Sequence, residues 1–227
     1  MKRTFTLVVA SAAILMLTNS SLAQQFEAVH AVHYQSTDQA KESLDKLMKD
    51  DSMKGARVTL YAQTFGERAS SHVVVEDFAS YKDYMTSTDA RLGSHAWSRY
   101  LLQTMDSEYR GSNLAMVVDD HGAARHTAGY LAAYLLNTTD AATYRSAIAD
   151  MNTAVGNPGV LRLVALRTGN RNVTHAVLVG AADFEALNMY LDKLFASDAF
   201  AAFLAKVGDT RNVVGINMYR RVATWGN

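Results

Sequence analysis

The sequence contains no cysteine, and this absence removes several kinds of chemistry at once. None of its 227 residues offers a thiol as a nucleophile, as a ligand for zinc or an iron–sulfur cluster, or as half of a disulfide. With 49% apolar residues, a chain of this length buries enough surface without cross-links. Its fold must therefore rest on packing, hydrogen bonds and ion pairs.

An excess of either charge is also missing. The chain carries 22 basic and 22 acidic residues, and they form no long run of one sign. A nucleic acid or an anionic membrane favours a basic face, so neither partner is expected. The seven histidines show no HxxxH or HxH spacing on one element, and we expect no metal site.

No apolar run reaches the roughly 20 residues that a membrane-spanning helix needs. The longest run, residues 5–17, follows the basic start Met1–Arg3 and precedes the small-residue sequence "SLA" at 21–23. This order is typical of a signal peptide over residues 1–23, with Gln24 as the new N-terminus. We therefore expect an exported bacterial protein, periplasmic or secreted, with no membrane span.

The chain contains an internal repeat. "HAVHYQSTDQAKESLDKL" aligns with "YLAAYLLNTTDAATYRSAI", which places Tyr34 on Tyr134 at an offset of 100 residues. Further on, His72 falls on His175 at an offset of 103, and "HAWSRYLL" falls on "DAFAAFLA". Similar offsets in separate blocks indicate a duplicated module.

Each copy has the same expected order of elements. An alternating strand (26–34 in the first copy) is followed by a polar capping sequence, a helix, two strands, a helical region (78–103) and a last strand. This β-α-β-β-α-β order is that of a ferredoxin-like unit. We predict an α+β fold in which two tandem ferredoxin-like repeats, 24–120 and 121–227, form an intramolecular dimeric α+β barrel with its helices outside.

Alternation divides every strand into two faces. We expect the purely apolar faces to pack under the helices, so that the polar faces line the barrel lumen. The expected lumen residues of the first copy are His30, Tyr34, Arg57, Tyr61 and His72. In the second copy the expected lumen is more apolar, with Val160, Val164, Leu166 and Val177 beside Arg162, Tyr130, Tyr134 and His175.

The stretch "SHVVVEDFASYKDYM", with "SHAW" after it, resembles the signature of the stress-responsive dimeric α/β-barrel (Dabb) proteins, which are grouped with polyketide cyclases and antibiotic-biosynthesis monooxygenases. The match is better in the first copy than in the second. It implies cofactor-free acid–base work on a bound molecule. The catalytic positions that it implies are His30, His72, Tyr84 and His95.

Arginine and tyrosine side chains complete the predicted site. Arg57 or Arg162 could hold a carboxylate or an enolate through two hydrogen bonds, and Tyr34 and Tyr61 would complete the substrate-binding set. We therefore predict a lyase, cyclase or isomerase without a cofactor, acting on a small molecule or an oligosaccharide. A lyase for an acidic sugar would suit this combination of histidine, tyrosine and arginine.

A packing role competes with catalysis at several of these positions. His72 recurs as His175, and Tyr84 also has a counterpart in the second copy, as expected of structural residues. His30 and His95 do not recur, which favours a function for them.

Two other functions stay open. The first is haem binding, as in tandem barrels of the chlorite dismutase kind, for which His175 would have to be the axial ligand. The second is a binding or structural module without catalysis. Association of two chains into a homodimer is open as well.

Overall fold

The structure, a computed structural model, describes residues 25–66, 70–105, 109–168 and 172–226, so the expected signal peptide lies outside the described residues. The first half contains β1 (Phe26–Val32), α1 (Thr37–Leu47), β2 (Arg57–Phe65), β3 (His72–Phe78), α2 (Tyr81–Leu92), α3 (His95–Met105) and β4 (Tyr109–Gly122). The second half contains β5 (Tyr130–Thr138), α4 (Ala141–Val155), β6 (Val160–Leu166), β7 (His175–Ala181), α5 (Phe184–Phe195), α6 (Asp198–Val207) and β8 (Arg211–Trp225). Short 3-10 turns are η1 (Asp51–Met53), η2 (Arg125–Thr127) and η3 (Gly208–Thr210).

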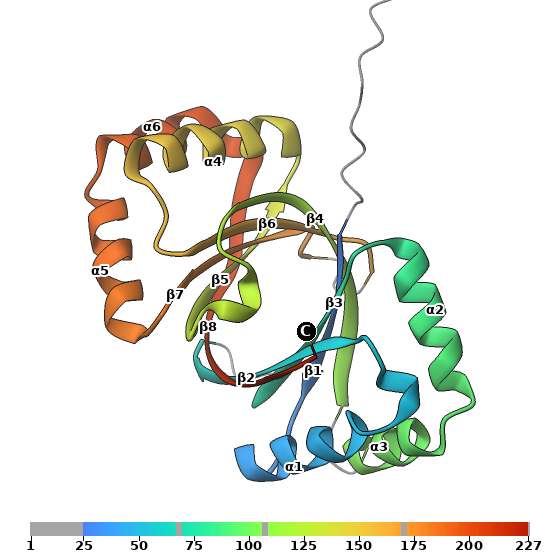
Figure 1. The fold of residues 1–227 in the computed structure, drawn as a ribbon. Coiled ribbons are helices and arrows are strands. Elements are labelled where there is room, and N and C mark those ends of the chain that lie inside the picture. Colours follow the sequence, from blue (N-terminus) through green and yellow to red (C-terminus); the bar gives the residue numbers. More distant parts are fainter. Residues whose placement is uncertain (1–24, 67–69, 106–108, 169–171, 227) are drawn as a thin grey trace, which may run out of the picture.

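The eight strands of the described residues form one closed antiparallel barrel, which confirms the predicted α+β barrel. Its strand order is β1-β3-β2-β8-β5-β7-β6-β4, and β4 closes the ring by pairing with β1. The halves meet at two seams, where β2 pairs with β8 and β4 pairs with β6. Helices α1–α3 lie outside the first-half strands and α4–α6 outside the second-half strands (Figure 1). Closure removes exposed strand edges.

The helices begin where the sequence places capping residues. The Ser36 hydroxyl accepts the backbone N–H of Gln39 at 3.1 Å, and the Asp140 carboxylate accepts that of Thr143 at 3.0 Å. These bonds satisfy N–H groups that the first turn of a helix leaves free. The polar capping sequences expected before these helices, "STDQ" at 36–39 and "NTTD" at 137–140, are thus confirmed. The buried residues of α1 recur every three or four positions, at Ala40, Leu44 and Leu47.

Apolar side chains from both halves fill the barrel lumen. The first half contributes Val29, Val73 and Val75, and the second contributes Leu131, Ala133, Leu135, Val164, Ala176 and Leu178. A space of only about 120 Å³ remains among them. An eight-stranded barrel is just wide enough for its own side chains, so branched apolar residues suit this position.

The predicted strand faces are right for β2 and β6 and wrong for β1, β3, β5 and β7. As expected, Tyr61 of β2 and Val164 of β6 face the lumen. In β1 and β3 the faces are reversed, because Val29 and Val75 occupy the lumen. The residues wrongly assigned to the lumen, which lie on the helix side, are His30, Tyr34, His72, Tyr130, Tyr134, His175 and Val177. Alternation shows which residues share a face, but not which layer that face meets.

Helices α4, α5 and α6 cover the second-half strands with a continuous apolar core. Buried members of this core include Ile148, Leu163, Val179, Leu187 and Phe203. Aromatic rings add to the packing, since Tyr144 and Phe203 meet edge to face with centroids 5.4 Å apart.

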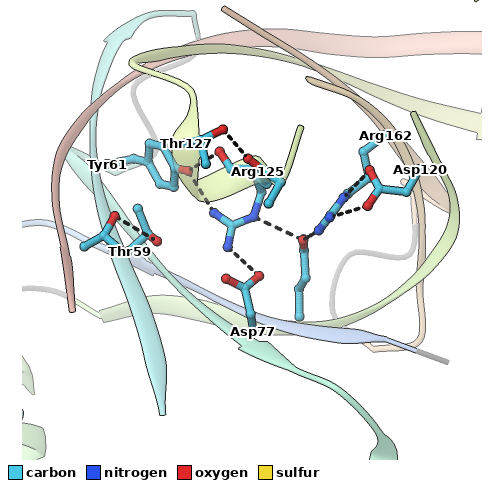
Figure 2. A network of polar contacts seen from close by, with 10 residues as sticks. Thr59, Tyr61, Asp77, Asp120, Arg125, Thr127 and Arg162 are labelled. Atoms are coloured by element: carbon cyan, nitrogen blue, oxygen red, sulfur yellow. Dashed lines mark hydrogen bonds and ion pairs between the residues drawn. The ribbon is translucent and has the colours of Figure 1, made fainter. Parts of the chain in front are cut away.

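A buried network of ion pairs joins the two halves at one end of the lumen (Figure 2). Arg125 of η2 donates from Nε to Glu27 of β1 at 3.1 Å and from Nη2 to Asp77 of β3 at 2.7 Å. Arg162 of β6 donates to the same Glu27 oxygen at 2.5 Å and makes two hydrogen bonds to Asp120 of β4. Glu27 and Arg125 are each only 2% exposed. Removing one member therefore leaves buried charge without compensation.

We predict that Glu27→Ala lowers the free energy of unfolding by about 3 kcal/mol, because Arg125 and Arg162 lose their shared buried partner. Urea unfolding followed by circular dichroism measures the change. Glu42→Ala is the matched control: Glu42 forms an exposed pair with Lys46 on α1, so its loss should hardly move the midpoint. Equal effects of the two variants would contradict a role for the network in stability.

Candidate functional site

An apolar cavity of about 420 Å³ lies between the outer face of the first-half strands and helices α1 and α3. Its apolar and aromatic walls are Val32, Leu44, Leu47, Met53, Val58, Val74, Trp97, Tyr100 and Leu101. Its other lining residues are His30, Glu76, Thr104 and Ser112. A mainly apolar hollow with a few converging polar groups is the usual form of a small-molecule site.

His30 reaches this cavity because its neighbour Val29 takes the lumen side of β1. Its Nδ1 lies 2.5 Å from the hydroxyl oxygen of Ser112, directly across the β1–β4 ladder. Its Nε2 lies 3.3 Å from Oε1 of Glu76. That second contact is not aligned as a hydrogen bond, and Nε2 has no hydrogen-bond partner among the described residues. The imidazole is thus held at one nitrogen and attracted by a carboxylate at the other.

Glu76 is itself held by an arginine. Arg91, at the end of α2, donates from Nη1 and Nη2 to the two carboxylate oxygens at 3.0 and 2.5 Å. The guanidinium also lies 4.8 Å from the ring centroid of Trp97. Burial alone would raise the pKa of Glu76, but the contacts with His30 and Arg91 outweigh burial and hold that pKa below its ordinary value. Glu76 therefore faces His30 as a carboxylate.

Tyr100 brings a hydroxyl to the same cavity from α3. It accepts a hydrogen bond from the hydroxyl of Tyr34 at 3.3 Å, which leaves its own proton for another acceptor. Burial raises the pKa of Tyr100 well above its ordinary value, so the phenol stays protonated near neutral pH. A ligand oxygen in the cavity could accept this proton in a hydrogen bond.

His72, predicted as catalytic, lies on the helix side but outside the cavity lining. Its Nδ1 is 2.8 Å from the Ser71 hydroxyl and its Nε2 is 3.1 Å from the Thr37 hydroxyl. Its ring packs edge to face on Tyr34, with centroids 5.7 Å apart. With both nitrogens occupied and 4% exposure, the side chain has the surroundings of a structural histidine.

The other two predicted catalytic residues, Tyr84 and His95, are not part of the cavity lining that contains His30. Tyr84 of α2 packs against Phe78 with centroids 5.3 Å apart, and it does not line the apolar cavity. His95 is the first residue of α3 and is exposed. The structure therefore keeps only His30 of the four predicted catalytic residues at the apolar cavity.

The predicted substrate-binding arginines lie together, but at a different cavity. Arg57 and Arg162 line a polar cavity of about 470 Å³ at the end of the lumen, along with Arg125. Tyr61 belongs to this end, since its hydroxyl accepts from Arg125 at 3.0 Å. Arg162 already has Asp120 and Glu27 as partners. The single pocket of histidine, tyrosine and arginine that the sequence predicts is thus divided between two sites.

The sequence prediction missed Glu76, Arg91, Tyr100 and Ser112. A comparison of the copies could have found three of them. At the offset of 103 residues, Glu76, Arg91 and Tyr100 correspond to Val179, Leu194 and Phe203, which are buried in the second-half core. At these three positions the first copy is polar where the second is apolar. Ser112 gives no such signal, because only strand pairing brings it to His30.

A haem iron would need an axial ligand with a nitrogen that faces open space. His30 has Ser112 at one nitrogen and the Glu76 carboxylate near the other. His175 bonds to the Thr174 hydroxyl at 2.9 Å and lines neither the apolar nor the polar cavity. The side chains as they lie do not fit axial ligation by either histidine.

Within the described ranges, no three histidine, aspartate or glutamate side chains group so as to hold a metal ion. No helix in these ranges has the length and apolar character to cross a membrane.

Comparison with known proteins gives the fold. No family model and no curated protein matches the sequence. Among solved structures, an anthrone oxidase-like protein matches with a TM-score of 0.60 and 10% identity over 91% of this chain and 94% of its own. A proposed monooxygenase of Fusobacterium nucleatum matches with a TM-score of 0.58 and 14% identity over 90% and 95%. A haem-binding protein of Thermus thermophilus matches with a TM-score of 0.53 and 8% identity over 89% and 92%.

Identities this low show the fold alone. The chain has an α+β barrel fold, which it shares with these neighbours. Membership of the Dabb family, and of the superfamily around it, stays a prediction.

The lowered pKa of Glu76 predicts a pH dependence of stability. The ordinary value is 4.5, so the ionised carboxylate stabilises the fold above about pH 4.5 and loses this effect as the pH falls through the folded-state pKa. Glu76→Gln should therefore be less stable than wild type at neutral pH, yet lose less stability on further acidification. Urea unfolding of both proteins at neutral pH and at about pH 3 measures the free energy of unfolding and how much of it each protein loses on acidification. An equal acid loss in the two proteins would contradict the assignment.

Proposed function

We propose that the protein is an enzyme that moves a proton on a small, largely apolar molecule in the apolar cavity, with His30 as the base. The observation that carries this proposal is the His30 imidazole, held between a hydroxyl and a carboxylate at the wall of that cavity. A base must be within hydrogen-bond reach of the proton that it takes, and a second group must orient it. His30 meets the second condition through Glu76.

The expected proton positions follow from the charges. An ionised carboxylate only accepts hydrogen bonds, so the proton of neutral His30 belongs on Nε2, which faces Glu76. The lone pair then lies on Nδ1, next to the Ser112 hydroxyl. His30 takes the substrate proton at Nδ1 directly or through that hydroxyl, and Glu76 balances the charge of the imidazolium. Tyr100 is placed to donate to the oxygen on which negative charge develops.

The cavity lining supports a substrate class. Walls of valine, leucine, tryptophan and tyrosine suit a compact aromatic or alicyclic molecule with one oxygen function. An acidic sugar is less well supported, because Arg57 and Arg162 lie at the polar cavity. Loss of a proton beside a carbonyl or from a phenol begins many lyase, cyclase and isomerase reactions. Two structural neighbours are named as an anthrone oxidase-like protein and a proposed monooxygenase. Their names suggest a further possible step, in which O₂ oxidises the anion formed by proton loss.

We predict that His30→Gln lowers the rate of deuterium exchange into anthrone by roughly 10²-fold or more, the usual loss when a general base is removed. Anthrone is a small apolar ketone with exchangeable hydrogens, and mass spectrometry of anaerobic reactions in D₂O follows the exchange. Uptake of O₂ in air then separates an oxygenase from an isomerase.

Matched histidine variants test the assignment. His95→Gln, at an exposed position, and His72→Gln, outside the cavity, should keep the exchange rate. A loss at His72 or His95 equal to that at His30 would favour the catalytic set implied by the sequence resemblance. In a Trp225→Phe background Trp97 is the single tryptophan, and it lines the cavity. Quenching of its fluorescence by anthrone then separates lost binding from lost chemistry.

Haem or small-ligand binding without catalysis is the alternative. It is favoured by the fold shared with a haem-binding protein. It is weakened by the neighbours of both His30 nitrogens and by the position of His175 outside both cavities. A Soret band on addition of haemin, lost in His30→Gln or His175→Gln, would support it. Failure to form that band would remove the haem form of this alternative.

The repeat and the export of the chain also belong to this proposal. We infer that the halves are tandem ferredoxin-like repeats, because β4-β1-β3-β2 and β8-β5-β7-β6 follow the same order; superposition of the halves checks this. Since the second half supplies the partner sheet, barrel closure needs no second chain. Export on residues 1–23 predicts a mature N-terminus at Gln24, which N-terminal sequencing would read.

A further inference from the structure

Ser112, His30 and Glu76 lie in a row along the cavity wall. The Ser112 hydroxyl oxygen is 2.5 Å from Nδ1 of His30, and Nε2 of the same ring is 3.3 Å from the Glu76 carboxylate. A hydroxyl next to a base, which is next to an orienting carboxylate, is the arrangement that activates a serine nucleophile. It is recognised by geometry and not by the order of residues along the chain.

The protonation states agree with such a role. Arg91 pairs with both oxygens of Glu76, so the carboxylate can only accept a hydrogen bond. The His30 proton then belongs on Nε2, and the lone pair on Nδ1 accepts the hydroxyl proton of Ser112. The loose alignment between Nε2 and Glu76 resembles that of many sites without substrate, whose hydrogen bonds tighten on binding.

The backbone presents Ser112 to the cavity. In the β1–β4 ladder Ser112 is paired with His30. The next pair is Ala31 with Gly111, and the register shifts after it, between Ala31 and Val32. Gly111, which precedes the serine, has φ +124°, a conformation that other residues adopt only with strain. Bulges of this kind often redirect a side chain next to an active site. Ser112 is also part of the cavity lining.

We propose that Ser112 is a nucleophile that carries an acyl group, which gives this cavity an esterase activity toward small, largely apolar esters. The inference rests on the proposed function, since it uses His30 as the base in the same cavity. The apolar walls would hold the acyl or aryl part, and the Tyr100 hydroxyl is available to donate to the carbonyl oxygen.

The reaction balances without a cofactor. Oγ of Ser112 forms a bond to the acyl carbon while its proton passes to Nδ1 of His30. The bond to the alcohol oxygen then breaks, and the alcohol leaves with that proton. Water attacks the acyl-serine and gives a proton to His30, and the carboxylic acid leaves as Oγ regains the proton. Glu76 faces the imidazolium in both halves of the cycle.

Two probes test the proposal on the full chain: diisopropyl fluorophosphate for covalent labelling and p-nitrophenyl butyrate for turnover. We expect one adduct per chain, located on Ser112 by peptide mass mapping. Ser112→Ala should abolish labelling and lower ester hydrolysis by several orders of magnitude, to the rate that binding and the Tyr100 hydroxyl support without a nucleophile. Ser98→Ala, at an exposed serine of α3, should change neither.

A second variant of Ser112 keeps the proposal testable if Ser112→Ala fails to fold. Ser112→Cys adds the only thiol of the chain, so iodoacetamide reports on that position alone. If His30 activates this position, alkylation should be several-fold faster than in the double variant with His30→Gln. Equal rates, or a wild-type fluorophosphate adduct on a residue other than Ser112, would overturn the proposal.

Deuterium exchange into anthrone separates this inference from the function on which it rests. If wild type shows His30-dependent exchange but neither labelling nor ester hydrolysis, the nucleophile is overturned and the acid–base function stands. If wild type shows none of the three, both are overturned.

Discussion

Each barrel strand has two faces, and closure of the barrel assigns one of them to a lumen that is too narrow for anything but side chains. Branched apolar residues such as Val29, Val75 and Leu131 meet that demand, and the remaining space of about 120 Å³ shows how fully they do so. Everything on the opposite faces must then be covered by helices. His30 and Glu76 lie under α1 and α3 because the valines beside them in sequence occupy the lumen.

The two halves share a framework but differ in what lies under their helices. In the second half, Val179, Leu194 and Phe203 pack into a continuous core. At the same positions the first half has Glu76, Arg91 and Tyr100, and a cavity of about 420 Å³ remains. Apolar residues at these positions pack well in the second half, so packing does not explain the polar residues at the same positions of the first half. A site for a small molecule is the explanation that we develop.

Buried ion pairs occur on both sides of the strand wall, and they have different consequences. The pairs of Glu27 with Arg125 and Arg162 connect β1, η2 and β6, and so join the two halves. The pair of Glu76 with Arg91 fixes a carboxylate beside His30. Desolvation offsets much of the attraction within a buried pair, so such pairs fix positions more than they add stability. The pair of Glu76 with Arg91 gives His30, the proposed base, a defined orientation.

The sequence alone determined the features that depend on near neighbours in the chain. Alternation and capping located strands and helices, because strand period and the N–H groups of a first helical turn are local properties. The repeat predicted a barrel with its helices outside, and the absence of a second copy of His30 marked that residue as functional.

Tertiary structure decided which face of each strand meets the lumen and which distant residues meet each other. His30 and Ser112 are 82 residues apart, and Glu27 and Arg162 are 135 apart, so no local pattern connects them. His72 and Tyr84 matched a family pattern, yet the packed structure places them outside the cavity lining. The physical reason is that strand alternation defines two faces without labelling them, and only barrel closure and helix packing choose between them.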